Sequence, residues 1–185
     1  MNSLQTKFLE APLAYDGTQL APHWIYRNTD LLGDALVAFI GEAVVGVEHM
    51  VDLEDVKKNA PIYSPSMLHF IGEWFTESFE LGIAYQHLFI HTVCEQLRAR
   101  AVPIRREGDD IYVDNLKLSV SIATRSVGSV LMHTGLNIRT ENTPVPTVGL
   151  ETLGVPVAAL ADACLNQFSR DYTTWQRARF KVLPR

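Results

Sequence analysis

The segment from Ile104 to Ile138, which reads IRREGDDIYVDNLKLSVSIATRSVGSVLMHTGLNI, decides how the rest of the chain is interpreted. Asp114-Asn115 is typical of a tight turn, and Gly128 permits a second reversal. The apolar residues of the segment recur at strand-like spacings: Ile111, Val113, Leu116, Leu118, Val120 and Ile122. These features together predict a β meander.

Lys117 lies midway along this meander, between Leu116 and Leu118. Side chains alternate along a strand, so Lys117 should lie on the face opposite its two neighbours. A lysine that points into a cleft is a good ligand for a carboxylate or phosphate, whereas one that points into water is an ordinary surface residue. The sequence leaves both interpretations open.

The same segment carries a motif of polar and glycine residues, namely Gly108, Asp110, Asp114-Asn115, Lys117, and His133 followed by Gly135, Leu136, Asn137 and Ile138. This motif resembles the biotin and lipoate protein ligases and the related octanoyltransferases. The whole chain, from Tyr15-Asp16-Gly17 through His49 to Asp55, also resembles an uncharacterised prokaryotic family of unknown function. That family is thought to share the fold of biotin/lipoate ligases and class II aminoacyl-tRNA synthetases.

The ligase resemblance implies roles for several residues. Lys117 would contact the acyl carbonyl and the phosphate of an acyl-adenylate and stabilise a developing oxyanion. His133 would lie near the same pocket and completes the predicted catalytic pair, with Asn137 on the same strand as a substrate-binding residue. Arg105 and Arg106 could hold a carboxylate or phosphate, although alternation allows only one of them to face the site.

The chain departs from the ligase pattern at three places. The residues after the lysine are Leu118 to Ser121 where ligases carry glycine, and no glycine-rich nucleotide loop is present. No cysteine lies in the segment from Pro144 to Leu150, so a covalent acyl-thioester route is not expected. The cofactor is therefore unassigned, with ATP and Mg²⁺ as the ones that the resemblance would imply.

Two other segments could contribute to a site. Trp24 and Tyr26 could form a ring-binding wall with Arg27 as an anion ligand, or a strand spanning Thr18 to Asn28 could simply bury the aromatic residues. His69, within the apolar run Met67 to Ile71, is either a hydrogen-bonded core residue or a substrate-binding group.

An acidic segment offers a further candidate cluster, made of Glu48, His49, Asp52 and Asp55. It could bind Mg²⁺ or act as a general base. Alternatively, Asp52 caps a short helix whose first turn holds Glu54 and Asp55, which needs no metal. We assign no metal site from the sequence.

The totals indicate one soluble globular domain over residues 1–185. Hydrophobic residues make up 47% of the chain and charged residues 20%. The net charge of −5 makes nucleic acid an unlikely partner. No signal peptide or membrane-length apolar run is apparent, and the two cysteines, Cys94 and Cys164, are expected to be reduced core residues of a cytoplasmic protein.

The remaining elements follow from periodicity. Residues 34–47 predict a hairpin of two buried strands, residues 61–66 a connection, residues 81–101 a long amphipathic helix and residues 152–177 a second one. Residues 139–149 predict a loop, a candidate cover for a pocket. The order of elements predicts an α+β fold with a mixed or antiparallel sheet packed with helices on one face, similar to biotin/lipoate ligases.

The leading functional hypothesis is an acyl-transfer or adenylate-forming enzyme, a ligase or acyltransferase, that acts on a small carboxylic acid. The first alternative is a non-catalytic small-molecule or protein-binding module that has lost the nucleotide loop. The second is a metal-assisted hydrolase built on Glu48, His49 and Asp52. A small-molecule substrate is expected, no membrane partner is expected, and a homodimer is left open.

Overall fold

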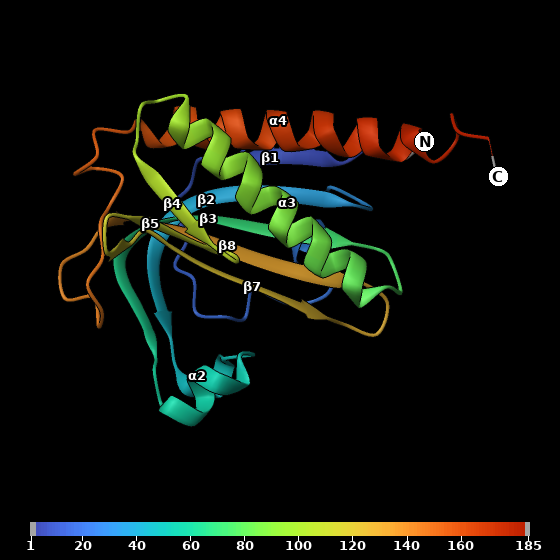
Figure 1. Ribbon diagram of the computed structural model, residues 1–185. Helices are drawn as coiled ribbons and strands as arrows, with labels where there is room; N and C mark the ends of the chain where they lie inside the picture. The colour runs from blue at the N-terminus through green and yellow to red at the C-terminus, as the bar shows by residue number, and fades with distance from the viewer. Residues whose placement is uncertain (1–2, 184–185) are drawn as a thin grey trace.

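The computed structural model describes residues 3–183 as two β-sheets and two long helices (Figure 1). The larger sheet has the order β1-β2-β3-β8-β7, and the smaller has the order β4-β5-β6. In chain order the elements are β1 (Gln5–Leu9), α1 (Trp24–Thr29), β2 (Ala35–Val45), the 3-10 helix η1 (Val47–His49), α2 (Leu53–Lys58), β3 (Ile62–Trp74), α3 (Phe79–Arg98), β4 (Ile104–Glu107), β5 (Asp110–Val113), β6 (Leu116–Lys117), β7 (Ser119–Arg125), β8 (Val130–Arg139) and α4 (Val157–Ala178). Among the strand pairs that residues 3–183 form in the large sheet, β1–β2 is parallel and the others are antiparallel, so this sheet is mixed.

The helices α3 and α4 cover one face of the large sheet (Figure 1). The strands send alternate apolar residues to this face, where Leu68, Phe70 and Met132 pack with Phe89 of α3 and Phe168 of α4. The other face of β2 and β3 packs a smaller apolar cluster that includes Tyr15, Ile25 and Phe39. The prediction of an α+β fold with a mixed sheet covered by helices on one face is confirmed.

Both long helices form where their periodicity predicts. In α3, Tyr85, Phe89, Val93 and Leu97 recur every four residues and are all buried. The side chain of Ser78 accepts a hydrogen bond from the backbone N–H of Leu81 at 3.2 Å and caps the first turn. The helix ends at Arg98, before Pro103.

The predicted meander forms but is divided between the two sheets. The tight turn occurs at Asp114, which adopts a left-handed conformation with φ 53°. The chain leaves the small sheet after Lys117 and enters the large one at Ser119. Leu118 joins the two sheets, because its N–H donates to the carbonyl of Ile111 at 2.8 Å and its own carbonyl accepts from Asn137 at 2.9 Å.

Three local predictions are wrong. Residues 34–47 form one long strand, β2, with a bulge between Gly41 and Ala43, and most of residues 61–66 belong to β3. The segment from Leu13 to Tyr15 runs beside β2 at this bulge, so Gly41 serves close backbone approach and not a hairpin turn. A Cβ atom on Gly41 would lie 1.9 Å from the carbonyl oxygen of Leu13.

The third wrong prediction concerns the segment that was expected to be a strand over Thr18 to Asn28. Residues 18–23 form turns, and the chain from Trp24 forms the short helix α1, in which Ile25 and Thr29, one turn apart, are both buried. The two cysteines are free and buried, as expected. Across residues 3–183, no helix combines the length and the apolar character that crossing a lipid bilayer requires.

We predict that Gly82→Ala destabilises the fold although alanine is the better helix former. Gly82 of α3 lies against β8, and a Cβ atom there would lie 2.0 Å from Cγ1 of Val130. Overpacking of this kind costs about 1–3 kcal/mol, measurable as a lower free energy of unfolding in urea. In a Val130→Ala background the same change should be neutral or stabilising, and Gly128→Ala, which meets no atom within 4 Å, is the control. Equal stability of Gly82→Ala and wild type would contradict this packing.

Candidate functional site

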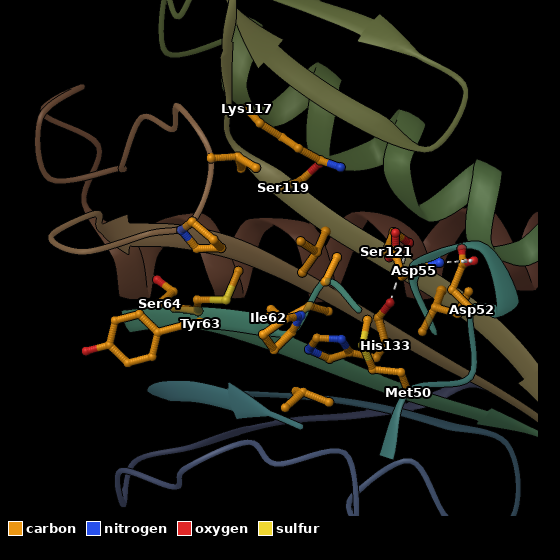
Figure 2. Close-up of a pocket in the computed structure, with 18 of the residues that line it drawn as sticks. Met50, Asp52, Asp55, Ile62, Tyr63, Ser64, Lys117, Ser119, Ser121 and His133 are labelled. Atoms are coloured by element: carbon orange, nitrogen blue, oxygen red, sulfur yellow. Dashed lines mark hydrogen bonds between the residues drawn. The ribbon is translucent and has the colours of Figure 1, made fainter. Parts of the chain in front are cut away.

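A cavity of about 590 Å³ lies beside the face of β3 and β8 that α3 and α4 leave uncovered (Figure 2). Its size is within the usual range for a small-molecule site. Its other walls are formed by the end of β2, the start of β3 and helix α2, which lies between them in the chain. Edge strand β7, strands β5 and β6, and the loop after β8 complete the lining. Much of the lining is apolar, including Val45, Met50, Ile62, Met67, Val120 and Ile122.

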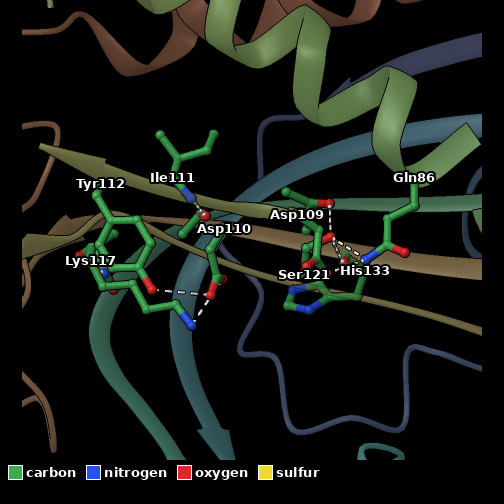
Figure 3. A network of polar contacts seen from close by, with 11 residues as sticks. Gln86, Asp109, Asp110, Ile111, Tyr112, Lys117, Ser121 and His133 are labelled. Carbon is green, nitrogen blue, oxygen red and sulfur yellow. Dashed lines mark hydrogen bonds and ion pairs between the residues drawn. The ribbon is translucent and has the colours of Figure 1, made fainter. Parts of the chain in front are cut away.

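Lys117 lies on the wall of this cavity, which answers the question that the sequence left open. Its Nζ atom is 2.9 Å from Oδ1 of Asp110, and the hydroxyl of Tyr112 donates to Oδ2 of the same carboxylate at 3.3 Å (Figure 3). The Lys117 and Asp110 side chains are 29% and 28% exposed, so neither extends freely into solvent. An ammonium group has three N–H donors, and those that Asp110 does not occupy can bind a ligand oxygen.

The loop after β8 lies alongside Lys117. The N–H of Lys117 donates to the carbonyl of Pro146, and its carbonyl accepts from the N–H of Val148, both at 3.1 Å. These bonds form a short parallel bridge at Thr147. Pro144, Val145 and Thr147 line the cavity, so the structure places the predicted loop over a pocket.

His69 of β3 and His133 of β8 form a buried pair at the site. Nδ1 of His69 lies 3.0 Å from Nε2 of His133, and Nε2 of His69 lies 3.2 Å from the carbonyl oxygen of Gly41. The ring of Tyr15 stacks on His133 with centroids 3.8 Å apart. Tyr15 and His133 line the cavity, whereas His69 lies behind them.

The hydrogen bonds determine which nitrogens carry protons when both rings are neutral. The Gly41 carbonyl can only accept, so Nε2 of His69 must carry the proton and its Nδ1 must accept. Nε2 of His133 must therefore be the donor between the rings, which leaves Nδ1 of His133 with a free lone pair. Among the described residues, none forms a hydrogen bond with that Nδ1 atom.

Burial keeps both rings neutral at pH 7. It lowers the pKa of His69 from 6.5 to about 4, although the carbonyls of Gly41 and Glu42 act in the opposite direction. Burial also lowers the pKa of His133 well below its ordinary value, with a further contribution from His69. The pKa of Tyr15 is raised by burial and then by Asp16, so its phenol stays protonated.

A second polar network joins α3 to β7 and to Asp109 (Figure 3). The side-chain amide of Gln86 donates to Oδ2 of Asp109 at 2.8 Å and to the hydroxyl of Ser121 at 2.9 Å. Asp109 and Ser121 line the cavity, but sequence reasoning found neither of them, nor Gln86 or Tyr15. The sequence could have indicated Gln86, because it is a polar residue on the buried side of the predicted helix, one turn after Gly82.

Asn137, the predicted substrate-binding residue, lines the cavity, with Nδ2 3.5 Å from the carbonyl oxygen of Lys117. The predicted arginine ligands do not reach it. Arg105 pairs with Glu107 and lies 4.8 Å from the ring centre of Tyr112, while Arg106 donates to the carbonyl of Gly108 at 2.7 Å. Both belong to β4, which is separated from the cavity by β5.

Trp24 and Arg27, which were predicted to form an aromatic and anion-binding wall, also lie away from the cavity. Because this segment is a helix, Trp24 packs on Phe39 with ring centroids 6.0 Å apart, and Arg27 is exposed on the surface. Neither residue lines the cavity.

The acidic segment adopts the structural alternative. Oδ1 of Asp52 accepts from the N–H groups of Glu54 at 2.7 Å and Asp55 at 3.3 Å, so Asp52 caps α2. His49, Asp52 and Asp55 line the cavity, whereas Glu48 does not. Within residues 3–183, no three His, Cys, Asp or Glu side chains are grouped as metal ligands.

The buried histidine pair should make the fold sensitive to acid. The pKa of a histidine in the unfolded chain is about 6.5, whereas burial lowers the pKa of His69 in the folded protein to about 4. Between these two pH values the unfolded state therefore binds more protons. The stabilisation is complete above about pH 6.5 and is lost as the pH falls to the folded pKa, which for His69 amounts to roughly 3 kcal/mol.

Urea unfolding of wild type between pH 7 and 4 should therefore show falling stability, with a shallower pH dependence for His69→Gln. His91→Gln, which changes an exposed histidine paired with Glu95 on α3, is the matched control and should keep the wild-type slope. An unchanged slope in His69→Gln would show that this ring does not titrate as described.

The names of two proteins that are more than 30% identical to this chain assign them no function. The chain is 32% identical over 155 residues to the uncharacterized protein MJ0805 of Methanocaldococcus jannaschii, which covers 80% of this chain and 70% of that protein. It is 35% identical to a solved protein of unknown function from Pyrococcus horikoshi, with a TM-score of 0.91 over 98% of this chain and all of the other.

More distant solved structures establish the fold. A bi-partite lipoate protein ligase from Thermoplasma acidophilum has a TM-score of 0.58 at 16% identity, over 91% of this chain and 83% of that one. A biotin protein ligase from Aquifex aeolicus in complex with biotin has a TM-score of 0.58 at 13% identity, over 94% and 72%. The predicted biotin/lipoate-ligase-like fold is thus confirmed.

The profile of one family, a domain of unknown function known as DUF366, matches residues 4–183. That range includes β1 and α4, the two elements that begin and end the described fold. The chain belongs to the DUF366 family.

Proposed function

We propose that this protein is an acyl-transfer or adenylate-forming enzyme that acts on a small carboxylic acid or its activated derivative. The observation that carries the proposal is the position of Lys117, a paired ammonium on the wall of a largely apolar cavity of about 590 Å³. An apolar cavity with few polar groups suits a small organic acid, whose apolar part contacts the walls while its carboxyl group meets the ammonium.

The geometry gives Lys117 a defined chemical role in this proposal. Asp110 neutralises and orients the ammonium, because their 2.9 Å ion pair holds the lysine side chain against the wall. The remaining N–H donors can bond to an acyl carbonyl oxygen and stabilise the negative charge that develops on it during attack. Such donors are effective because they are already in place before the reaction.

The solved ligases support this proposal at the level of fold. One lipoate-protein ligase is described as bound with ATP, and the Aquifex enzyme as bound to biotin. By analogy, the activating co-substrate here would be ATP with Mg²⁺, and Lys117 would contact a phosphate oxygen as well as the acyl group. A cytoplasmic location and a small-molecule partner belong to the same proposal.

A non-catalytic binding module is the second candidate. The observation that favours it is the absence from the sequence of the glycine-rich loop with which ligases hold a nucleotide. The same cavity and the same lysine would then retain an organic acid without activating it. The metal-assisted hydrolase is not proposed, since Asp52 caps α2 and Glu48 does not line the cavity.

We predict that a small carboxylic acid, alone or with ATP and Mg²⁺, raises the melting temperature of the wild-type protein and not of Lys117→Ala. The panel comprises ATP, other nucleotides, biotin, lipoate, octanoate and amino acids, each with and without Mg²⁺. A ligand at about one hundred times its dissociation constant stabilises the fold by roughly 2.7 kcal/mol. Lys7→Ala, an exposed lysine of β1 at the far edge of the sheet, should respond like wild type.

The outcome also distinguishes the two candidate functions. A stabilising acid together with exchange of pyrophosphate into ATP supports the enzyme, whereas a stabilising acid without any turnover supports the binding module. An equal shift in Lys117→Ala and wild type would place the ligand away from Lys117 and refute the site.

A further inference from the structure

We infer that Nδ1 of His133 is the proton acceptor of this cavity and that His69 is the residue that positions it. In the proposed acyl transfer, on which this inference rests, the attacking group would be an N–H or O–H that donates its proton to that nitrogen. Lys117 would then stabilise the negative charge on the acyl oxygen, and His133 would accept the proton of the attacking group.

The backbone determines which nitrogen of His133 carries the free lone pair. The carbonyl of Gly41 requires a proton on Nε2 of His69, and this in turn requires a proton on Nε2 of His133. The remaining nitrogen of His133, Nδ1, is the only ring atom of the pair that can accept a proton from outside. His133 lines the cavity, and the described residues offer Nδ1 no hydrogen bond.

Neighbouring side chains and backbone hold the His69–His133 pair rigidly. Tyr15 stacks on His133 with an interplanar angle of 12°, and Phe39 stacks on His69 with centroids 5.0 Å apart. The Gly41 carbonyl cannot shift easily, because the backbone of Leu13 passes close beside β2 there and its N–H donates to the carbonyl of Ile40 at 3.0 Å. A proton acceptor fixed in this way needs no reorientation when a substrate arrives.

The proposed proton transfer balances in atoms and electrons. The attacking nitrogen or oxygen forms a bond to the acyl carbon, and its proton moves to Nδ1 of His133. The bond between that carbon and the leaving group, a phosphate in an acyl-adenylate, then breaks and the leaving group takes the electron pair. His133 becomes an imidazolium that still donates to His69, and it returns its proton to the leaving group or to water.

A weak base suffices for this step. An amine that has bonded to an acyl carbon carries a positive charge and is far more acidic than the free amine. Burial lowers the pKa of His133, but the same burial keeps the ring neutral and ready to accept.

The test is to determine the protonated nitrogens directly, by nitrogen NMR of the full chain with ¹⁵N-labelled histidine at pH 7. Both His69 and His133 should carry their protons on Nε2, and Nδ1 of His133 should be bare. His69→Phe removes the acceptor between the rings and should raise the population of the other His133 tautomer about fivefold, the effect of one lost hydrogen bond. His69→Gln, whose side-chain oxygen can accept, should restore the wild-type tautomer.

A second readout tests access to the cavity. Diethyl pyrocarbonate acylates a neutral imidazole at its lone pair, and peptide mass spectrometry locates the product. We expect modification of His133 and protection of His69, with modification of exposed His91 as the internal control.

A proton on Nδ1 of His133 in the wild-type protein, or no modification of His133 by the time His91 is complete, would overturn the inference. His69→Gln keeps the test decisive if His69→Phe does not fold. Neither readout uses a carboxylic acid or a nucleotide, so a failed ligand screen and a failed tautomer assignment remain distinguishable.

Discussion

Alternation along β3 and β8 is the constraint on which the rest of the structure depends. Successive side chains of a strand point to opposite faces of the sheet. One set of residues must therefore pack against the helices, and the other set must line the cavity. In β8, Met132 and Leu136 enter the core with α3 and α4, while His133 and Asn137 line the cavity. A shift of register by one residue would bury the wrong set, so a single pairing of β3 with β8 fixes both the fold and the site.

The buried histidine pair is the costly part of this arrangement. Neutral imidazoles must be completely hydrogen-bonded to be buried without penalty, and within residues 3–183 the ring of His133 hydrogen-bonds only to His69, whose own Nε2 lies 3.2 Å from the carbonyl oxygen of Gly41. That carbonyl is available because β2 bulges at Gly41, where the segment from Leu13 to Tyr15 passes close by. The result is one nitrogen without a partner at the cavity. A purely structural pair would be expected to satisfy that atom within the protein, so the free lone pair is the observation that favours a chemical role.

Local sequence patterns predicted the fold well where one residue period dominated. The four-residue repeat of Tyr85, Phe89, Val93 and Leu97 located α3, and the alternation around Lys117 located the meander. The bulge at Gly41 was not predictable, because its cause is a segment nearly thirty residues away in the sequence. The same limitation applies to the site. Lys117, His133 and Asn137 were found through a motif within one segment, whereas Tyr15 and Gln86 reach the site only through tertiary packing. Arg105 and Arg106 were adjacent to the motif in sequence, yet β5 separates them from the cavity.

The cavity is lined by two chemically distinct polar groups, and this difference bears on which ligands it suits. A lysine paired with a carboxylate offers donors, and a neutral histidine offers an acceptor. A site that only retained an organic acid would need the donors and the apolar walls, since a carboxylate has no proton to give at neutral pH. The acceptor would repel that ligand if it lay beside the carboxylate. It becomes useful when a second group, one that carries a proton, must be bound next to the first. The presence of both a donor and an acceptor in one cavity therefore suits two reactants that meet there better than one ligand that rests there.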